Sequence, residues 1–153
     1  MEPEVLARSE LEQVRRRRAE LRESLDALER ALAAPAVGRP LIWGERVRAV
    51  LAEVADDFRE HIAVTEGPGG LHQAILAGDL RLANAVAALT DQHALIADAL
   101  HVCLVDAEAP VADEDVHGIR ERATDLLAAL VRHRQRGADL IFEAYATDIG
   151  EGD

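Results

Sequence analysis

Residues 47–65 read VRAVLAEVADDFREHIAVT, and apolar residues recur in this stretch every three or four positions. That period predicts an amphipathic α-helix, because residues three and four apart lie on one face of a helix. The apolar face is formed by Val47, Leu51, Val54 and Phe58. The same spacing continues through His61 and Thr65, so the predicted buried face ends in polar side chains.

The rest of the chain repeats this period in three further stretches. Together they predict helices over about 3–34, 41–66, 79–105 and 116–146. Prolines and glycines interrupt the pattern at 34–40 and again at 67–70, since proline cannot donate the helical hydrogen bond. Long helices joined by short connections favour one all-α domain over residues 1–153, an up-down-up-down antiparallel four-helix bundle. Residues 71–76 are expected to add a short turn, and 106–115 a solvated loop.

The composition agrees with this fold and limits the classes of function. Aromatic residues make up 3% of the chain, so we expect an aliphatic core. The formal net charge of -12 argues against nucleic acid or an anionic membrane as a partner. The single cysteine, Cys103, excludes a disulfide framework and a thiolate zinc cage. Neither a signal peptide nor a long apolar span is evident, so a cytoplasmic location is expected.

Polar residues lie on the predicted buried face of each helix: Arg18, His61, His93 and His133. Counted from the predicted turns, their depths along the bundle differ by about 6–8 Å, so all four are expected in one layer. An unpaired buried polar group costs about 1–3 kcal/mol, so three facing imidazoles need partners. A metal ion would satisfy them. The competing solution is a hydrogen-bonded layer that includes Arg18 and a carboxylate.

These residues resemble the haemerythrin-like (HHE) family over nearly the full chain. The resemblance rests on three segments, EHIAVTEGPGGL at 60–71, DQHALI at 91–96 and RHRQRGADLIFEAYATDIG at 132–150. They are similar to the family's second-helix His and Glu, its third-helix His, and its last-helix His with a following carboxylate. The resemblance implies a four-helix bundle with non-haem iron that handles dioxygen, nitric oxide or peroxide, or senses iron or oxygen.

The ligand set that the resemblance implies is reduced. The helix predicted over about 3–34 offers Arg18 where the family usually has a histidine. Thr65 stands four residues beyond His61, and Glu66 follows it. One metal ion would then be held by His61, Glu66, His93 and His133. Iron is the expected metal, with zinc, manganese or no metal as alternatives. The candidates for contacts around these ligands are Arg18, Asp139, Glu143 and Tyr145.

Three further histidines and one glycine carry separate expectations. His72, His101 and His117 fall off the predicted faces or near turns, so they are expected at the surface. Gly137 lies one turn past His133, where glycine costs about 1 kcal/mol relative to alanine. Close helix packing is the favoured explanation for this glycine, and a pocket for a small ligand is the alternative.

The leading functional hypothesis is a metal-binding protein for small-molecule binding, sensing or redox chemistry, with dioxygen, nitric oxide or peroxide as ligand. Whether it is an enzyme stays open, since catalysis would need an open coordination position. One alternative is a metal-free bundle that binds a protein partner or forms a homodimer. Another is a metal-dependent enzyme similar to the DinB-like thiol transferases, although the order of the motifs argues against it.

Overall fold

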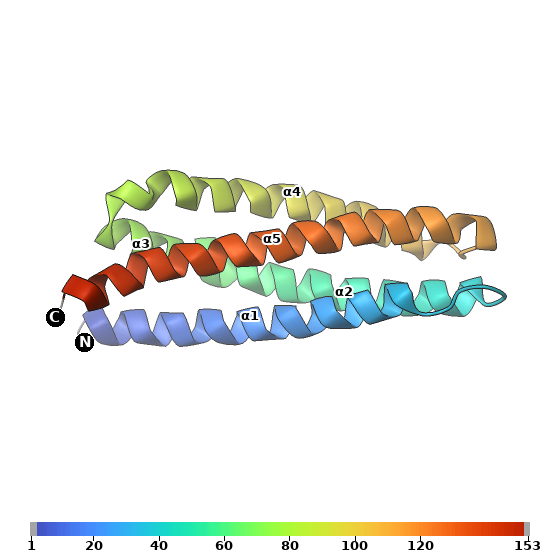
Figure 1. Ribbon diagram of the computed structural model, residues 1–153, viewed down its shortest axis with the longest axis horizontal. Coiled ribbons are helices and arrows are strands. Elements are labelled where there is room, and N and C mark those ends of the chain that lie inside the picture. The colour runs from blue at the N-terminus through green and yellow to red at the C-terminus, as the bar shows by residue number, and fades with distance from the viewer. Residues whose placement is uncertain (1–2, 152–153) are drawn as a thin grey trace.

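Helices and short connections make up the described part of the chain. The structure is a computed structural model that gives the backbone of residues 3–151 and the side chains of residues 9 and 11–145. The elements are α1 (Pro3–Ala33), α2 (Pro40–Glu66), α3 (Leu71–Gly78), the 3-10 turn η1 (Leu80–Leu82), α4 (Ala83–Glu108) and α5 (Asp113–Glu151). Figure 1 shows the four long helices side by side, with both chain ends at one end of the molecule and the α1–α2 and α4–α5 connections at the other. The expected all-α class and the packing of four helices are confirmed.

The connection between α1 and α2 is fixed by Arg120, which reaches it from α5. Its guanidinium donates hydrogen bonds to the carbonyl oxygens of Leu32 at 2.8 Å and Ala34 at 3.1 Å, acceptors that the end of α1 leaves open. It also lies 5.2 Å from the ring centroid of the buried Trp43. Pro40 begins α2 at a position where no N–H is needed. Contacts among three helices therefore close this end of the bundle.

α2 ends at Glu66 because the Gly-Pro-Gly-Gly sequence that follows cannot continue it. The N–H of Gly67 closes the last turn on the carbonyl of Ala63 at 3.2 Å. Gly69 takes a φ of 73°, a left-handed conformation that favours glycine. The chain then turns directly into α3, which is the extra turn expected after the glycines.

The start of α4 differs from the expected boundary near residue 79. The carboxylate of Asp79 accepts a hydrogen bond from the backbone N–H of Arg81 at 3.0 Å. This contact caps the separate turn η1, so α4 begins only at Ala83.

The stretch 106–115 is mostly helical, which corrects the expectation of a solvated loop. α4 continues to Glu108 and α5 begins at Asp113, so only 109–112 connects them. Acidic side chains in the first turn of α5 complement the positive end of that helix, so these charges stabilise a helix start. Val111 in the connection is only 4% exposed and packs into the core.

Gly44 in α2 allows this close approach of Val111. A Cβ placed at Gly44 would lie 2.8 Å from Val111 Cβ and closer still to one of its methyl groups. Gly44→Ala is therefore expected to lower the free energy of unfolding by about 1–3 kcal/mol, despite the better helix propensity of alanine. Urea unfolding measures this loss. In a Val111→Ala background, Gly44→Ala should lower the free energy of unfolding only slightly. A loss as large as in the wild-type background would show that the close approach of Val111 is not the cause.

The interior consists of two apolar clusters with a polar layer between them. One cluster fills the half of the bundle near the α1–α2 connection and includes Leu28 and Leu51. The other surrounds α3 and includes Leu71 and Ile75. The polar layer lies against Phe58 of the first cluster and contains the histidines predicted at one depth. None of the described helices combines the length and apolar character that crossing a membrane requires.

Candidate metal centre

His61, His93 and His133 converge in the bundle interior from α2, α4 and α5. Their side chains are buried, and each offers one ring nitrogen to a group whose atoms all lie within 4.8 Å of one another. The Nε2 atoms of His61 and His133 are 3.3 Å apart. The prediction that these three residues lie at one level of the bundle is therefore confirmed.

His93 is oriented by Glu66 at the end of α2. The Glu66 carboxylate accepts a hydrogen bond from the Nδ1–H of His93. A neutral imidazole carries a single N–H, so the Nε2 of His93 presents a lone pair to the interior. That Nε2 is buried and has no hydrogen-bond partner among the described residues.

Glu66 is therefore a neighbour of the converging group and not a member of it. The group's ligand atoms come from the three histidines alone, whereas the carboxylate contacts the outward nitrogen of His93. α2 reaches Glu66 as a regular α-helix, so no π-bulge turns this side chain toward the centre. A carboxylate in such a position orients a histidine ligand and raises its basicity. In this structure Glu66 takes this supporting position, and its role as a fourth ligand stays a prediction.

His133 is oriented in the same way by Gln92, the neighbour of His93 in α4. The Nδ1 of His133 lies 2.8 Å from the Oε1 of Gln92, which accepts its N–H. The Nε2 of His133 then also carries a lone pair, and it faces His61. Two of the three histidines are thus held in the tautomer that metal ligation through Nε2 requires.

Hydrogen bonds alone do not satisfy the layer. If the Nε2–H of His61 donates to the Nε2 of His133, the Nδ1 of His61 and the Nε2 of His93 stay buried without partners among the described residues. Each such group costs about 1–3 kcal/mol. A cation at the centre would accept lone pairs from all three Nε2 atoms and would account for the orientation of His93.

The spacing of the nitrogens fits one tetrahedral divalent ion. Two imidazole nitrogens bound at about 2.0–2.1 Å with a tetrahedral angle between them would lie about 3.3–3.4 Å apart. The distance between the Nε2 atoms of His61 and His133 is 3.3 Å. Three protein ligands would leave a position on the ion for an external ligand.

Burial keeps the imidazoles neutral, which is the form that binds metals. It lowers the pKa of His61 to about 3 and the pKa of His133 to about 4, and the neighbouring His93 adds to both shifts. Burial also lowers the pKa of His93, even though the Glu66 carboxylate acts in the opposite direction. The three imidazoles are therefore uncharged at neutral pH.

Arg18 reaches this layer from α1. Its guanidinium donates a hydrogen bond to the carbonyl oxygen of Arg134 at 3.2 Å, which ties α1 to α5. Its charge contributes to the lowered pKa values of His61 and His133. The expected position of Arg18 beside the histidines is what the structure shows.

The other residues expected around the ligands lie farther out. Asp139 is exposed and accepts a hydrogen bond from the Gln135 amide at 3.1 Å. Glu143 is exposed as well. Tyr145 is half-buried and packs against the apolar cluster around α3. Of the four residues expected around the ligands, Arg18 therefore borders the histidines, and the other three lie farther out.

His72 is buried, which corrects the expectation that it lies at the surface. Its ring stacks on that of His93, with centroids 5.8 Å apart and planes inclined by 5°. Its Nδ1 lies 3.1 Å from the Oγ1 of Thr90. The turn at 67–70 directs α3 back onto the histidine layer, so a residue outside the period of α2 still reaches the interior. The remaining two histidines, His101 and His117, are exposed as expected.

Gly137 borders open space, which corrects the expectation of close helix packing. A Cβ placed there would meet no heavy atom within 4 Å. Gly137 also lines a small pocket of about 20 Å³ that the three histidines share. The missing side chain therefore leaves room beside His133.

Gly137→Ala is expected to raise the free energy of unfolding by about 0.5–1 kcal/mol, because alanine forms helix better and has space here. Urea unfolding should therefore show a higher free energy of unfolding for Gly137→Ala and a lower one for Gly44→Ala, each relative to the wild type. A destabilised Gly137→Ala protein would mean that the space beside His133 is needed for folding.

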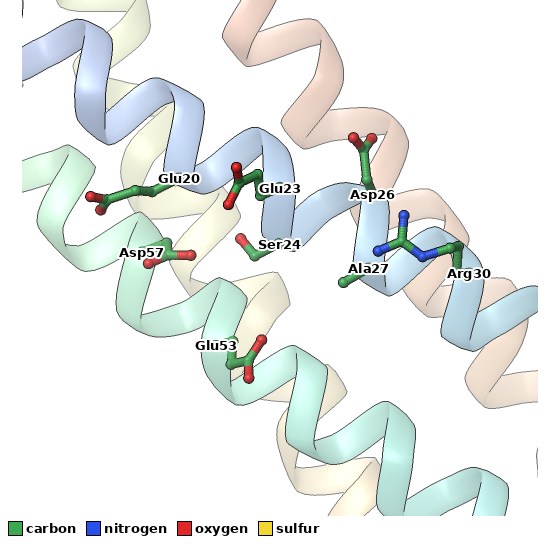
Figure 2. Close-up of a pocket in the computed structure, with 8 residues that line it drawn as sticks. All are labelled: Glu20, Glu23, Ser24, Asp26, Ala27, Arg30, Glu53 and Asp57. Carbon is green, nitrogen blue, oxygen red and sulfur yellow. The ribbon is translucent and has the colours of Figure 1, made fainter.

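A second hollow lies at the surface between α1 and α2 (Figure 2). It has a volume of about 510 Å³ and is lined mainly by carboxylates, those of Glu20, Glu23, Asp26, Glu53 and Asp57. Ser24 points toward α2 in Figure 2, and its hydroxyl donates to the Leu21 carbonyl of its own helix at 3.0 Å. None of the lining side chains is a buried group without a partner. This hollow therefore lacks the buried polar atoms without partners that are found in the histidine layer.

Three residues contact the converging histidines or their neighbours although the sequence did not predict them there: His72, Thr90 and Gln92. Gln92 adjoins His93 in sequence, which was the one available signal, but its contact is made across helices to His133. His72 and Thr90 meet only because α3 folds against α4. No family model, no curated protein and no solved structure matches this chain, so its geometry alone defines the site.

Proposed function

We propose that this chain is a haemerythrin-like metal-binding protein, an up-down-up-down antiparallel bundle that holds one divalent ion at the Nε2 atoms of His61, His93 and His133. The ion would bind a small ligand such as dioxygen, nitric oxide or peroxide for sensing or redox chemistry. The observation that carries the proposal is the Nε2 of His93, which is buried and has no hydrogen-bond partner among the described residues. Because Glu66 takes the Nδ1–H, that nitrogen carries a lone pair, and the His93 ring centroid lies 5.2 Å from that of His61 and 4.7 Å from that of His133.

The surroundings of the histidines support the same proposal. Glu66 and Gln92 each engage an Nδ1 atom, as the outer partners of histidine ligands do in metal sites. The Phe58 ring covers the layer, with its centroid between 5.7 and 6.0 Å from each of the three imidazoles. An apolar cover of this kind limits access of water to a bound ion.

The donor set narrows the choice of metal. Imidazole suits iron, zinc and several other transition metals, whereas manganese prefers oxygen ligands. With Glu66 outside the converging group, the set is three imidazoles, which weighs against manganese. The resemblance to haemerythrin-like proteins favours iron, with zinc as the alternative.

The rival function is a metal-free bundle in which the polar layer is structural and the helices bind a partner or a second copy. The observation in its favour is the contact between His61 and His133 at 3.3 Å, which can be a hydrogen bond without any ion. This reading leaves the Nε2 of His93 unpaired at a cost of about 1–3 kcal/mol, which is why we prefer the metal.

Metal analysis separates the two proposals. Protein purified anaerobically from iron-supplemented cultures is expected to contain about one equivalent of a transition metal per chain. Apoprotein should also take up about one equivalent of cobalt(II) or zinc. Less than about a tenth of an equivalent in both experiments would end the metal proposal. Two equivalents of iron would instead show that the site is dinuclear.

Glu66→Gln is expected to weaken metal binding by about 10–100-fold, because the neutral amide no longer raises the basicity of His93. Competition with a chromophoric chelator measures the change for zinc or cobalt(II). Glu53→Gln is the matched control, since Glu53 lies on the same helix but faces the surface groove of Figure 2. If Glu66→Gln and Glu53→Gln bind metal with equal affinity, Glu66 does not support the metal site.

A further inference from the structure

A further hollow lies at the surface between α1 and α5, which run side by side (Figure 1). It has a volume of about 620 Å³, and four arginines line it: Arg15, Arg18, Arg22 and Arg134. The first three follow one another along α1 at steps of three and four residues, so they share the helix face toward α5. We call this hollow the arginine groove. It concentrates positive charge at one place in a chain whose net charge is -12.

The guanidinium groups of the arginine groove are not neutralised by carboxylates. None of the four forms an ion pair within the part of the chain whose side chains are described. Arg17, a neighbour on the α2 side of the same helix, does form ion pairs, with Glu20 at 3.0 Å and Glu60 at 3.7 Å. The fold therefore compensates the arginine charge on the α2 side of α1 and leaves the charges on the α5 side uncompensated.

Two of these charges are held close together across the helices. The half-buried Arg18 donates a hydrogen bond to the carbonyl oxygen of Arg134 at 3.2 Å, which fixes its guanidinium against α5. Burial lowers the pKa of Arg18, and the positive charge of Arg134 lowers it further, so the charged form is disfavoured here. Arginine cannot shed its proton at physiological pH. An anion in the groove would stabilise both guanidinium groups.

The length of the groove indicates an anion with several charges. Arg15 and Arg22 are seven residues apart, about 10 Å along the helix, which is too far for one phosphate group to contact both. Guanidinium groups match phosphate oxygens in paired hydrogen bonds. A phosphate chain carries charge on every unit, whereas an extended acidic peptide presents only every second side chain to one face.

The rest of the lining limits what else the groove can recognise. No aromatic side chain lines it, so a nucleobase would find no ring on which to stack. Glu23 and Asp26 line it as well and follow Arg22 along α1, so they oppose an anion that extends farther in that direction. This boundary disfavours a long polyanion such as nucleic acid.

We propose that the arginine groove binds a short phosphate chain, of the diphosphate or triphosphate class, between α1 and α5. Its four guanidinium groups supply the charge, and the phosphate chain is the part of the ligand that is recognised. Such an anion is too large for the pocket of about 20 Å³ beside the histidines, so it would lie outside that pocket on the surface. The groove therefore provides a function that needs no metal ion.

Isothermal titration of the full-length protein with tripolyphosphate tests this site. Tripolyphosphate should bind about tenfold or more tightly than orthophosphate, because it reaches more guanidinium groups. The double variant Arg15→Gln/Arg22→Gln changes exposed positions, so it should fold normally and weaken tripolyphosphate binding by about tenfold or more. Arg134→Gln should weaken binding from the α5 side. Arg30→Gln is the matched control, since this exposed arginine of α1 lines the carboxylate hollow of Figure 2.

A second set of titrations fixes the class of ligand. ATP should bind no more tightly than tripolyphosphate, and a DNA oligonucleotide or a hexaglutamate peptide should bind more weakly. Tighter binding of any of these three would overturn the assignment to a phosphate chain. The site itself is overturned if tripolyphosphate does not bind at millimolar concentration, or binds Arg15→Gln/Arg22→Gln as tightly as the wild type.

His93→Ala separates this proposal from the metal site. The variant should lose metal and still bind tripolyphosphate like the wild type, because His93 does not line the arginine groove. Loss of tripolyphosphate binding in a folded His93→Ala protein would place the anion at the histidines and overturn the groove. A wild-type protein without metal that binds tripolyphosphate would overturn the metal site alone.

Discussion

His93→Ala abolishes tight metal binding, and with it the gain in stability that metal gives, if the three histidines form the site. A ligand present at 1,000 times its dissociation constant stabilises the native state by about 4 kcal/mol. His93 supplies the unpaired Nε2 and the link to Glu66, so its removal leaves only two imidazoles. Urea unfolding of wild type and variant, each with and without zinc, measures the metal-dependent difference.

The matched control for this experiment is His101→Ala. His101 lies on the same helix and is exposed, so its loss should leave the response to zinc intact. If the polar layer is structural and binds no metal, His93→Ala should instead destabilise the protein equally with and without zinc. The difference between the two measurements, and not the stability of the variant itself, therefore decides between the metal site and the structural layer.

Acidification from pH 6.5 to pH 5 is expected to destabilise the metal-free protein steeply. In the fold the pKa of His61 is about 3 and that of His133 about 4, against 6.5 for an ordinary histidine. Below pH 6.5 the unfolded chain therefore binds protons that the native state does not, and stability falls as pH falls. Each histidine contributes up to about 1.4 kcal/mol per pH unit until its native pKa is reached. Above pH 6.5 this contribution is constant.

Urea unfolding in the presence of a chelator, at half-unit steps of pH, measures this slope. Carboxylates of the unfolded chain titrate mainly below pH 5, so the chosen window isolates the histidines. His133→Leu should reduce the slope by about one proton, whereas His101→Gln, at an exposed position, should not. A flat profile between pH 6.5 and pH 5 would show that these imidazoles are protonated in the native state.

The sequence was most informative where one helical period could be followed without interruption. Continuing the spacing of Leu51 and Phe58 led to His61, and the same procedure located His93 and His133 at one depth. It worked because the position of a residue along a straight helix depends only on its distance from the turn.

Contacts made across helices could not be obtained in this way. His72 lies on α3, whose direction is set by the turn at 67–70 and not by any period. Gln92 and Thr90 flank the buried face, and their contacts depend on which rotamers meet a neighbouring helix. Glycine alone also cannot distinguish close packing from a gap, and the structure shows packing at Gly44 and space at Gly137.

The polar layer also bears on how the helices find their alignment. In a core built largely of leucine, valine and alanine, sliding one helix by seven residues matches apolar positions with apolar positions again. A slide of α5 by that amount would bring Leu126 or Leu140, both buried leucines, to the level now held by His133. The lone pairs of His61 and His93 would then face a hydrocarbon. Even before any ion binds, the histidines therefore penalise misaligned packings and specify one register for an otherwise permissive bundle.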